Sequence, residues 1–200
     1  MEGDGALALV IQILVGVSLA ACCGLRAFLP PFVFGISVRL GVVEAVLGQP
    51  VSLNPSFEWM ASTPALVVFG AALVSDVLAD KIPVVDNALD MVQTFVRPLA
   101  GTLVVAASLT DVGPLHAVVL GLLVGGSVAG GVHVVKSKAR LASTLGTAGL
   151  ASPVLSVAED LTATLGSLLA VTVAIAAFLG LFALILAGWM VVRIARRGRS

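Results

Sequence analysis

Long apolar stretches separated by short polar segments run along the chain and predict an all-helical membrane protein. Residues 6–25 are apolar apart from Gln12 and small polar side chains, and residues 115–135 form a stretch of similar length. About 20 apolar residues in a helix cross a bilayer, so each stretch predicts one transmembrane helix. No charge interrupts Leu161 to Val192, and with residues 153–160 this is long enough for about two further spans.

Proline residues predict where the other helices begin and bend. Ser62-Thr63-Pro64 has the pattern of a helix start, because a hydroxyl caps the first turn and proline is tolerated there. Pro83 predicts a break between a helix that ends near Lys81 and an amphipathic helix over residues 84–97. The apolar residues that follow, as far as Thr110, are too few for a span of their own and are expected to continue that helix through a kink at Pro98.

Three segments are less regular in the sequence. Residues 27–47 contain Pro30, Pro31 and Arg39, which predicts either a tilted span or a broken, re-entrant segment. Residues 48–63 are predicted to form a polar loop, and residues 141–149, rich in Ser, Thr and Gly, a linker. Together these elements predict a polytopic helical bundle of about six to seven spans, some broken or re-entrant, with one amphipathic helix.

Acidic residues gather on both sides of the predicted break at Pro83. Asp76 and Asp80 are four residues apart, and so are Asp86 and Asp90, so each pair shares one helix face. Gln93 and Arg97 continue the second face as a polar stripe. Two interpretations remain open: a solvated helix corner at the membrane surface, and a polar site inside the bundle.

Charged side chains within membrane segments are costly and usually face a partner or a wet path. We expect Arg26 or Lys81 to pair with Asp76 and Asp80, with Glu159 and Asp160 nearby. Two close carboxylates resist double ionisation, so such a site can carry a proton or hold a cation. The candidates for a substrate or ion path are Arg26, Asp76, Asp80, Lys81, Asp86, Asp90, Arg97, Glu159 and Asp160.

This pattern favours a protein that transports or gates a small ion or polar solute. The alternative is a non-transporting scaffold, or a lipid- or partner-binding protein, in which the same charges form structural salt bridges. A membrane enzyme is not indicated, because His-Glu-x-x-His, nucleotide loops and a complete Gly-x-Ser-x-Gly are missing from the sequence. We therefore expect no catalytic residue, no metal site and no cofactor.

Composition supports the membrane assignment. The chain is 59% hydrophobic and 11% charged, with a mean hydropathy of +1.14, whereas soluble domains are about 25% charged. We expect one membrane-embedded domain over residues 1–200 with the lipid bilayer as its partner, and the net charge of zero gives no indication of nucleic acid. Small residues four apart let membrane helices approach closely. Gly121, Gly125, Gly126 and Gly130 have this spacing and should pack within the chain, with a homo-oligomer as the alternative.

Basic residues predict the orientation, because Lys and Arg accumulate in cytoplasmic segments. The tail over residues 193–200 is rich in arginine and should be cytoplasmic, as should Lys136, Lys138 and Arg140. The segment around Trp59 then lies outside. The N-terminus lies outside if residues 27–47 span the membrane, and inside if they re-enter.

Four segments, taken together, resemble one known family. They are Gly24-Leu-Arg-Ala-Phe-Leu-Pro30, Asp80-Lys-Ile-Pro-Val-Val-Asp86, Gln93-Thr-Phe-Val-Arg-Pro-Leu-Ala-Gly101 and Ser152-Pro-Val-Leu-Ser-Val-Ala-Glu-Asp160. The chain resembles the small bacterial integral membrane proteins classed as domain of unknown function 4126. The resemblance implies a multi-pass protein of the bacterial cytoplasmic membrane and adds no mechanism.

Overall fold

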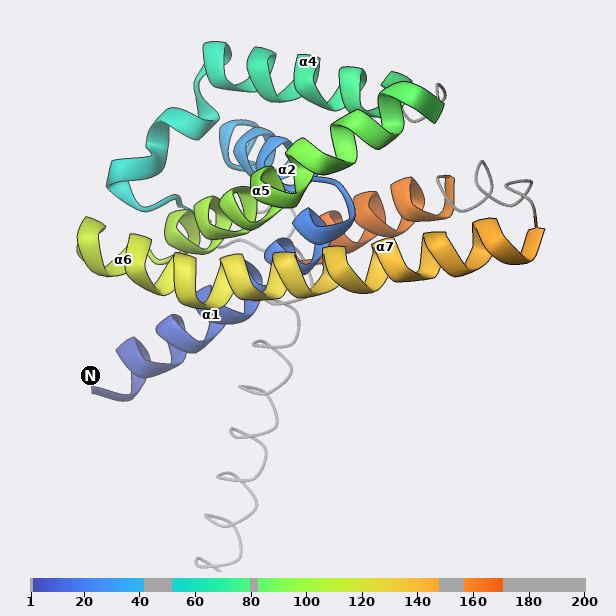
Figure 1. Cartoon of the computed structure of the whole chain (residues 1–200). Coiled ribbons are helices and arrows are strands. Elements are labelled where there is room, and N and C mark those ends of the chain that lie inside the picture. Colours follow the sequence, from blue (N-terminus) through green and yellow to red (C-terminus); the bar gives the residue numbers. More distant parts are fainter. Residues whose placement is uncertain (1, 42–51, 80–82, 148–156, 171–200) are drawn as a thin grey trace, which may run out of the picture.

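The computed structural model of the chain describes residues 2–41, 52–79, 83–147 and 157–170, and every regular element among them is helical (Figure 1). The tail at residues 193–200 lies outside this part. The elements are α1 (Glu2–Leu25), α2 (Leu29–Arg39), the 3₁₀ helix η1 (Pro55–Ala61), α4 (Thr63–Ala79), α5 (Pro83–Ser108), α6 (Pro114–Leu120), the π-helical turn η2 (Gly121–Gly126), α7 (Ser127–Thr147) and a helical segment at residues 157–170.

Helix starts follow the prolines as predicted. The Ser62 hydroxyl accepts a hydrogen bond from the Ala65 backbone N–H at 3.4 Å, at the start of α4. Helix α5 begins at Pro83 and continues through Pro98 to Ser108, so the predicted continuation is confirmed. Pro98 has no N–H to donate to the preceding turn of the helix. Separately, the Thr102 hydroxyl donates to the Pro98 carbonyl at 2.8 Å.

Two segments predicted to be irregular are ordered. The expected polar loop at residues 48–63 contains η1, and its buried Asn54 donates to the carbonyls of Leu109 and Val112 at 2.6 and 2.8 Å. Asn54 therefore holds the chain just beyond the end of α5. The expected linker at residues 141–149 is also wrong, because α7 continues to Thr147. For the segment with η1, the hydrogen bonds of Asn54 to residues distant in the sequence override the local preference for a loop.

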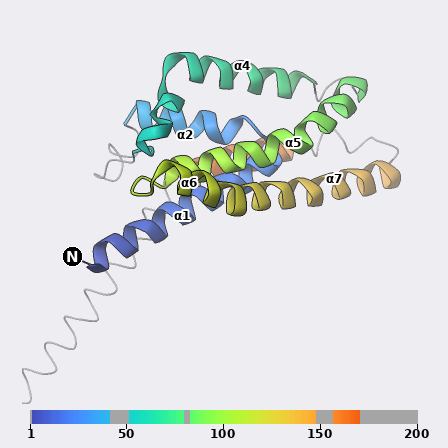
Figure 2. The same ribbon diagram turned by 60° about the vertical axis from the view of Figure 1, so that its left-hand side comes forward.

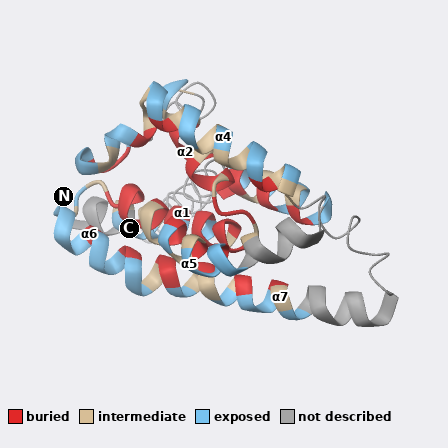
Figure 3. Cartoon of the chain, turned by 45° about the horizontal axis from the view of Figure 1, so that its top comes forward, coloured by how far each residue is buried: buried red, intermediate tan, exposed pale blue. Residues whose placement is uncertain are grey.

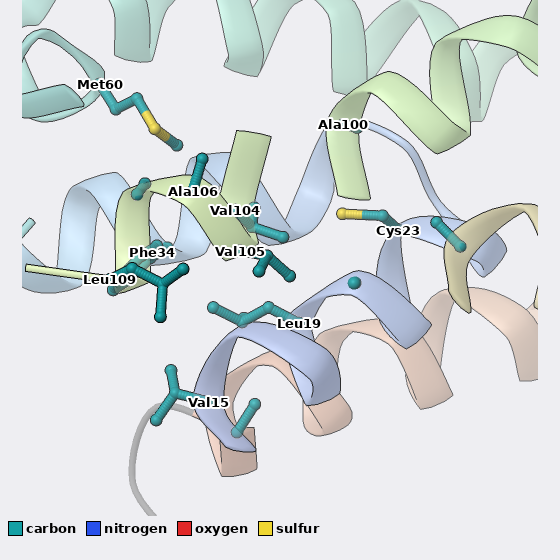
Figure 4. Close-up of a cluster of buried hydrophobic side chains, with 14 of the residues drawn as sticks. Val15, Leu19, Cys23, Phe34, Met60, Ala100, Val104, Val105, Ala106 and Leu109 are labelled. Carbon is teal, nitrogen blue, oxygen red and sulfur yellow. The ribbon is translucent and has the colours of Figure 1, made fainter. Parts of the chain in front are cut away.

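Helix α1 runs through the centre of the bundle and packs against α5, α7 and α2. Helix α4 packs on α2, and both views place it over one side of the bundle with α6 and α7 on the other (Figures 1 and 2). Figure 4 shows the apolar core between these elements, where Leu19 of α1 lies near Val105 of α5. Most of the remaining core side chains are alanine, valine and cysteine, so the helix axes lie close together.

Glycine permits the closest of these contacts. A Cβ atom on Gly121 would lie 2.5 Å from the Thr102 carbonyl oxygen, and one on Gly125 would lie 2.7 Å from the Gly101 carbonyl carbon. A Cβ atom on Gly126 would lie 3.1 Å from the Thr102 hydroxyl oxygen, whereas one on Gly130 would make only an ordinary contact with Pro98 Cγ at 3.5 Å. The glycine face therefore packs on α5 of the same chain, and Gly130 is its least constrained position.

Large apolar side chains on the surface and charged side chains in the interior distinguish this protein from a soluble helical protein. Large apolar side chains are exposed along the outer faces of α4, α5 and the α6–α7 segment (Figure 3), while charged side chains lie inside. This is the arrangement expected when lipid is the solvent. The exposed apolar residues include Val67, Val68, Leu78, Met91, Phe95, Leu99, Leu115, Leu122, Leu123 and Val135.

Within the described part of the chain, three helical stretches are long and apolar enough to cross a membrane: Ala8–Leu25, Met91–Ser108 and Pro114–Lys138. A fourth is counted if η1 and α4, which meet at 61°, form one bent span. The predicted six to seven spans are not confirmed. One reason is α2, whose 11 residues cover about 16 Å of an apolar core about 30 Å thick. The uncharged stretch beyond residue 170 and the residues 42–51 after α2 lie outside the described part of the chain.

Candidate functional site

The junction between α1 and α2 joins the end of an apolar helix to the start of the next one. The Arg26 N–H makes the last helical hydrogen bond of α1, to the Cys22 carbonyl at 2.9 Å, and α2 starts at Leu29. Pro30 and Pro31 occupy the first turn of α2, where the N–H groups that proline lacks would have no partner within the helix. Arg26 therefore lies in the short connection between a helix C-terminus and a helix N-terminus.

Two cationic side chains meet the carbonyl groups that end α1. The Arg97 guanidinium donates to the Gly24 carbonyl at 3.2 Å, and the Lys136 ammonium donates to the Leu25 carbonyl at 2.9 Å. The last carbonyls of a helix have no partner within it and carry its negative partial charge. Helices α5 and α7 thus each contribute one cation that caps the broken end of α1.

Arg26 itself contacts carboxylates from two further elements. Its Nη1 atom lies 3.3 Å from Asp76 Oδ2 of α4, and both side chains are 1% exposed. Its Nε atom pairs with Asp160 of the helical segment at residues 157–170, whose side chain is 33% exposed. One arginine therefore holds one fully buried and one partly exposed acid, and joins α1 to two other parts of the bundle.

A second group of polar side chains continues from Asp76 across α5 to α7. Gln93 donates to Asp76 and accepts from Arg97, so its amide links the two. Arg97 also contacts His133 Nδ1, and the other ring nitrogen of His133 lies 3.2 Å from the Thr94 hydroxyl. If Arg97 donates to Nδ1, His133 is the neutral Nε2–H tautomer and donates to Thr94. The polar groups thus form one connected path from Asp160 to Thr94.

We call these residues the ionic cluster: Arg26, Asp76, Gln93, Arg97, His133, Lys136, Glu159 and Asp160. The Lys136 ammonium completes it through an ion pair with Glu159 Oε2 at 2.8 Å. With His133 neutral, the cations Arg26, Arg97 and Lys136 balance the anions Asp76, Asp160 and Glu159. A buried charge is tolerated when it is paired and hydrogen-bonded, so this balance explains how the apolar bundle accommodates the cluster.

The candidates predicted from the sequence are placed as follows. The structure brings Arg26, Asp76, Arg97, Glu159 and Asp160 into the ionic cluster. Asp80 and Lys81 lie outside the described residues, and so do the side chains of Asp86 and Asp90, although their backbone is part of α5. Their roles, including any role in an ion path, stay predictions.

Three cluster members were not among the predicted site residues. Gln93 belongs to the predicted polar stripe of α5, and the structure buries Gln93 and Arg97 of this stripe while Met91 and Phe95 are exposed. His133 carries no signal of its own in the sequence and Lys136 is expected among the cytoplasmic basic residues; in the structure they are only 5% and 7% exposed. Their position on one face of α7, three residues apart, was the available signal.

Carboxylates, cations and backbone carbonyls at a helix break are groups that can bind a proton or a small ion. Among the described residues, no group of three or more His, Cys, Asp and Glu side chains is placed to hold a metal ion. A groove of about 250 Å³ lies away from the cluster, against the first half of α4, and is lined by Trp59, Ser62, Pro64, Ala65, Val68 and Phe69. The charged residues of the cluster are packed against one another rather than around this groove.

Comparison with known proteins identifies the family of the chain and assigns no activity to it. No curated protein and no solved structure matches the chain. The family model described as "Domain of unknown function (DUF4126)" matches residues 13–194, which includes α2, α4, α5 and α7 and every residue of the ionic cluster. The chain belongs to the DUF4126 family of proteins.

Proposed function

We propose that the protein transports or gates a small ion across a membrane, and that the ionic cluster at the break between α1 and α2 is its ion site. The observation that carries this proposal is the double pairing of Arg26 with Asp76 and Asp160. Burying several charges in an apolar bundle is costly, and intramembrane charges usually mark a path for ions or protons. Broken helices with exposed end groups supply such sites in many transporters.

Arg26 contacts two acids, so it keeps one carboxylate partner when the other acid is neutralised. When a proton or cation neutralises Asp160, its attraction to Arg26 weakens. Arg26 still keeps the buried carboxylate of Asp76, so the change strands no cation in the bundle. Asp160 is the member that water can reach, because its side chain is 33% exposed. We therefore assign Asp160 as the entry group and Arg26 as the group that competes with the ion.

The proposal predicts that Asp160→Asn abolishes ion flux while leaving the fold intact. The purified protein would be reconstituted into vesicles, and proton, sodium and potassium flux followed with ion-sensitive dyes. Asparagine keeps the shape of aspartate and removes its charge, so flux should fall to the level of protein-free vesicles. Glu58→Gln is the matched control, because Glu58 is an exposed acid in η1 and should leave flux unchanged.

A second function, a structural scaffold without transport, is favoured by one observation. The charges of the cluster balance and each contacts another member, as structural salt bridges would. A scaffold predicts that the parent protein carries no flux above empty vesicles under any ion gradient. Flux by the parent that survives Asp160→Asn would instead remove Asp160 from the ion path.

The orientation gives a separate prediction, which rests on the positive-inside distribution of basic residues. After replacement of the buried Cys22 and Cys23 by serine, a cysteine introduced at Ser137 should react with thiol reagents only from the cytoplasm. A cysteine at the exposed Ser52 should react from outside. The reverse labelling pattern would overturn the orientation.

A further inference from the structure

Lys136 has no role in the proposed exchange between Asp160 and Arg26, yet it is a buried cation of the bundle. It lies on α7 and is 7% exposed. Its Nζ atom lies 2.9 Å from the Leu25 carbonyl oxygen and 2.8 Å from Glu159 Oε2. Lys138, two residues along the same helix, is exposed. The ammonium of Lys136 is therefore held at a defined point by oxygen atoms from two other parts of the chain.

Both oxygens would attract a cation without the lysine. Leu25 is the last residue of α1, so its carbonyl has no partner within the helix and carries part of the negative end of the helix dipole. Glu159 adds a full carboxylate charge, and its side chain is only 11% exposed. A carbonyl at a broken helix end together with a carboxylate is a recurring combination for binding monovalent cations inside membranes.

We propose that the Leu25 carbonyl and the Glu159 carboxylate form a binding site for a small cation of the ammonium class, which Lys136 occupies as a tethered ligand. The distances fit this class. Both lie within the range of N–H···O hydrogen bonds, about 2.7–3.2 Å, and an ammonium group offers several donors for such oxygens. Lysine presents that group on a flexible stem of four carbons, so the ammonium can withdraw and leave both oxygens to an incoming ion.

This inference rests on the proposed function and names its substrate class as ammonium or a primary alkylammonium. The site adjoins the rest of the cluster. Glu159 and Asp160 are neighbours in sequence, and the Leu25 carbonyl directly precedes Arg26. An ion that enters at Asp160 therefore reaches the Leu25–Glu159 site by passing the broken end of α1.

The test is chemical rescue of Lys136→Ala with methylammonium. Truncation removes the tethered ammonium and leaves room for a free one beside Leu25 and Glu159. The variant should unfold at a lower temperature than the parent in detergent micelles. Saturating methylammonium should then raise its Tm by about 3 °C or more and leave the parent unchanged. Tetramethylammonium has no N–H donor and should produce no such rise.

Two further variants establish where the methylammonium binds. Lys138→Ala removes an exposed lysine from the same helix and should show no response. The double variant Lys136→Ala with Glu159→Gln loses the carboxylate and should lose the rescue. If Lys136→Ala is recovered unfolded, it is purified with methylammonium present throughout, and the yield of folded protein becomes the measurement.

The proposal is overturned if Lys136→Ala shows no gain in Tm or yield with methylammonium. It is equally overturned if tetramethylammonium or the Glu159→Gln double variant gives the same gain. Because this readout is binding and not flux, the two proposals fail separately. Rescue together with a parent that carries no flux would contradict the transport function and leave the cation site in place.

Discussion

Replacing Arg26 by glutamine should destabilise the folded protein by about 3–5 kcal/mol, the cost of removing one member of a buried ion pair. The expected loss lies at the upper end of that range, because Arg26 serves two acids and Asp76 is 1% exposed. Glutamine provides hydrogen-bond donors without charge, so the Asp76 carboxylate would remain buried without its compensating cation. Hydration can relieve Asp160 in part, because its side chain is partly exposed.

The measurement is the free energy of unfolding in mixed detergent micelles, compared with the parent under identical conditions. Arg39→Gln is the matched control. Arg39 ends α2 and is exposed, and among the described residues it donates to the Thr63 hydroxyl at 2.7 Å and the Ala61 carbonyl at 3.4 Å. Its replacement should cost less than about 1 kcal/mol. Equal losses in the two variants would show that burial gives Arg26 no special importance.

Replacing Gly125 by leucine should prevent the close packing of η2 on α5 and destabilise the protein by at least about 3 kcal/mol, the upper end of the usual cost of overpacking. A Cβ atom at Gly125 would lie 2.7 Å from both the Gly101 carbonyl carbon and Val105 Cγ2. Backbone atoms cannot move aside as a flexible side chain can. The two helices would have to separate at this point.

Gly131 provides the control for this prediction. It lies six residues along the same helical stretch, and a Cβ atom there would meet nothing within 4 Å. Leucine favours a helix over glycine by about 0.5–1 kcal/mol, so Gly131→Leu should leave the melting temperature unchanged or raise it slightly. If Gly125→Leu melts like Gly131→Leu, the helices do not pack through Gly125.

Local chemistry explains the part of the fold that could be predicted from sequence. Pro83 and Pro114 begin helices because proline fits the first turn, and Ser62 caps α4 through its hydroxyl. Each of these signals involves residues that are neighbours in the chain. The predicted span count is not confirmed, and α2 is one reason, because its 11 residues cover only about half of an apolar core about 30 Å thick.

The candidate site was accessible to sequence reasoning only through its charges. Arg26, Asp76 and Asp160 stand out because ionised groups are rare in apolar segments. Gln93, His133 and Lys136 do not, because glutamine and histidine are common at membrane surfaces and a lysine near the end of a span suggests a cytoplasmic flank. Only the packing of α5 and α7 on the end of α1 brings their side chains into the interior.

The most direct measurement of the central claim, a buried ionic cluster at the break between α1 and α2, is a double-mutant cycle between Arg26 and Asp76. Stabilities would be measured for the parent, Arg26→Gln, Asp76→Asn and the double variant. We expect strong coupling, because each single change leaves a buried charge without its partner. The loss of stability in the double variant should therefore be smaller than the sum of the two single losses by about 2 kcal/mol or more. Additivity within about 0.5 kcal/mol would contradict the ion pair and with it the cluster.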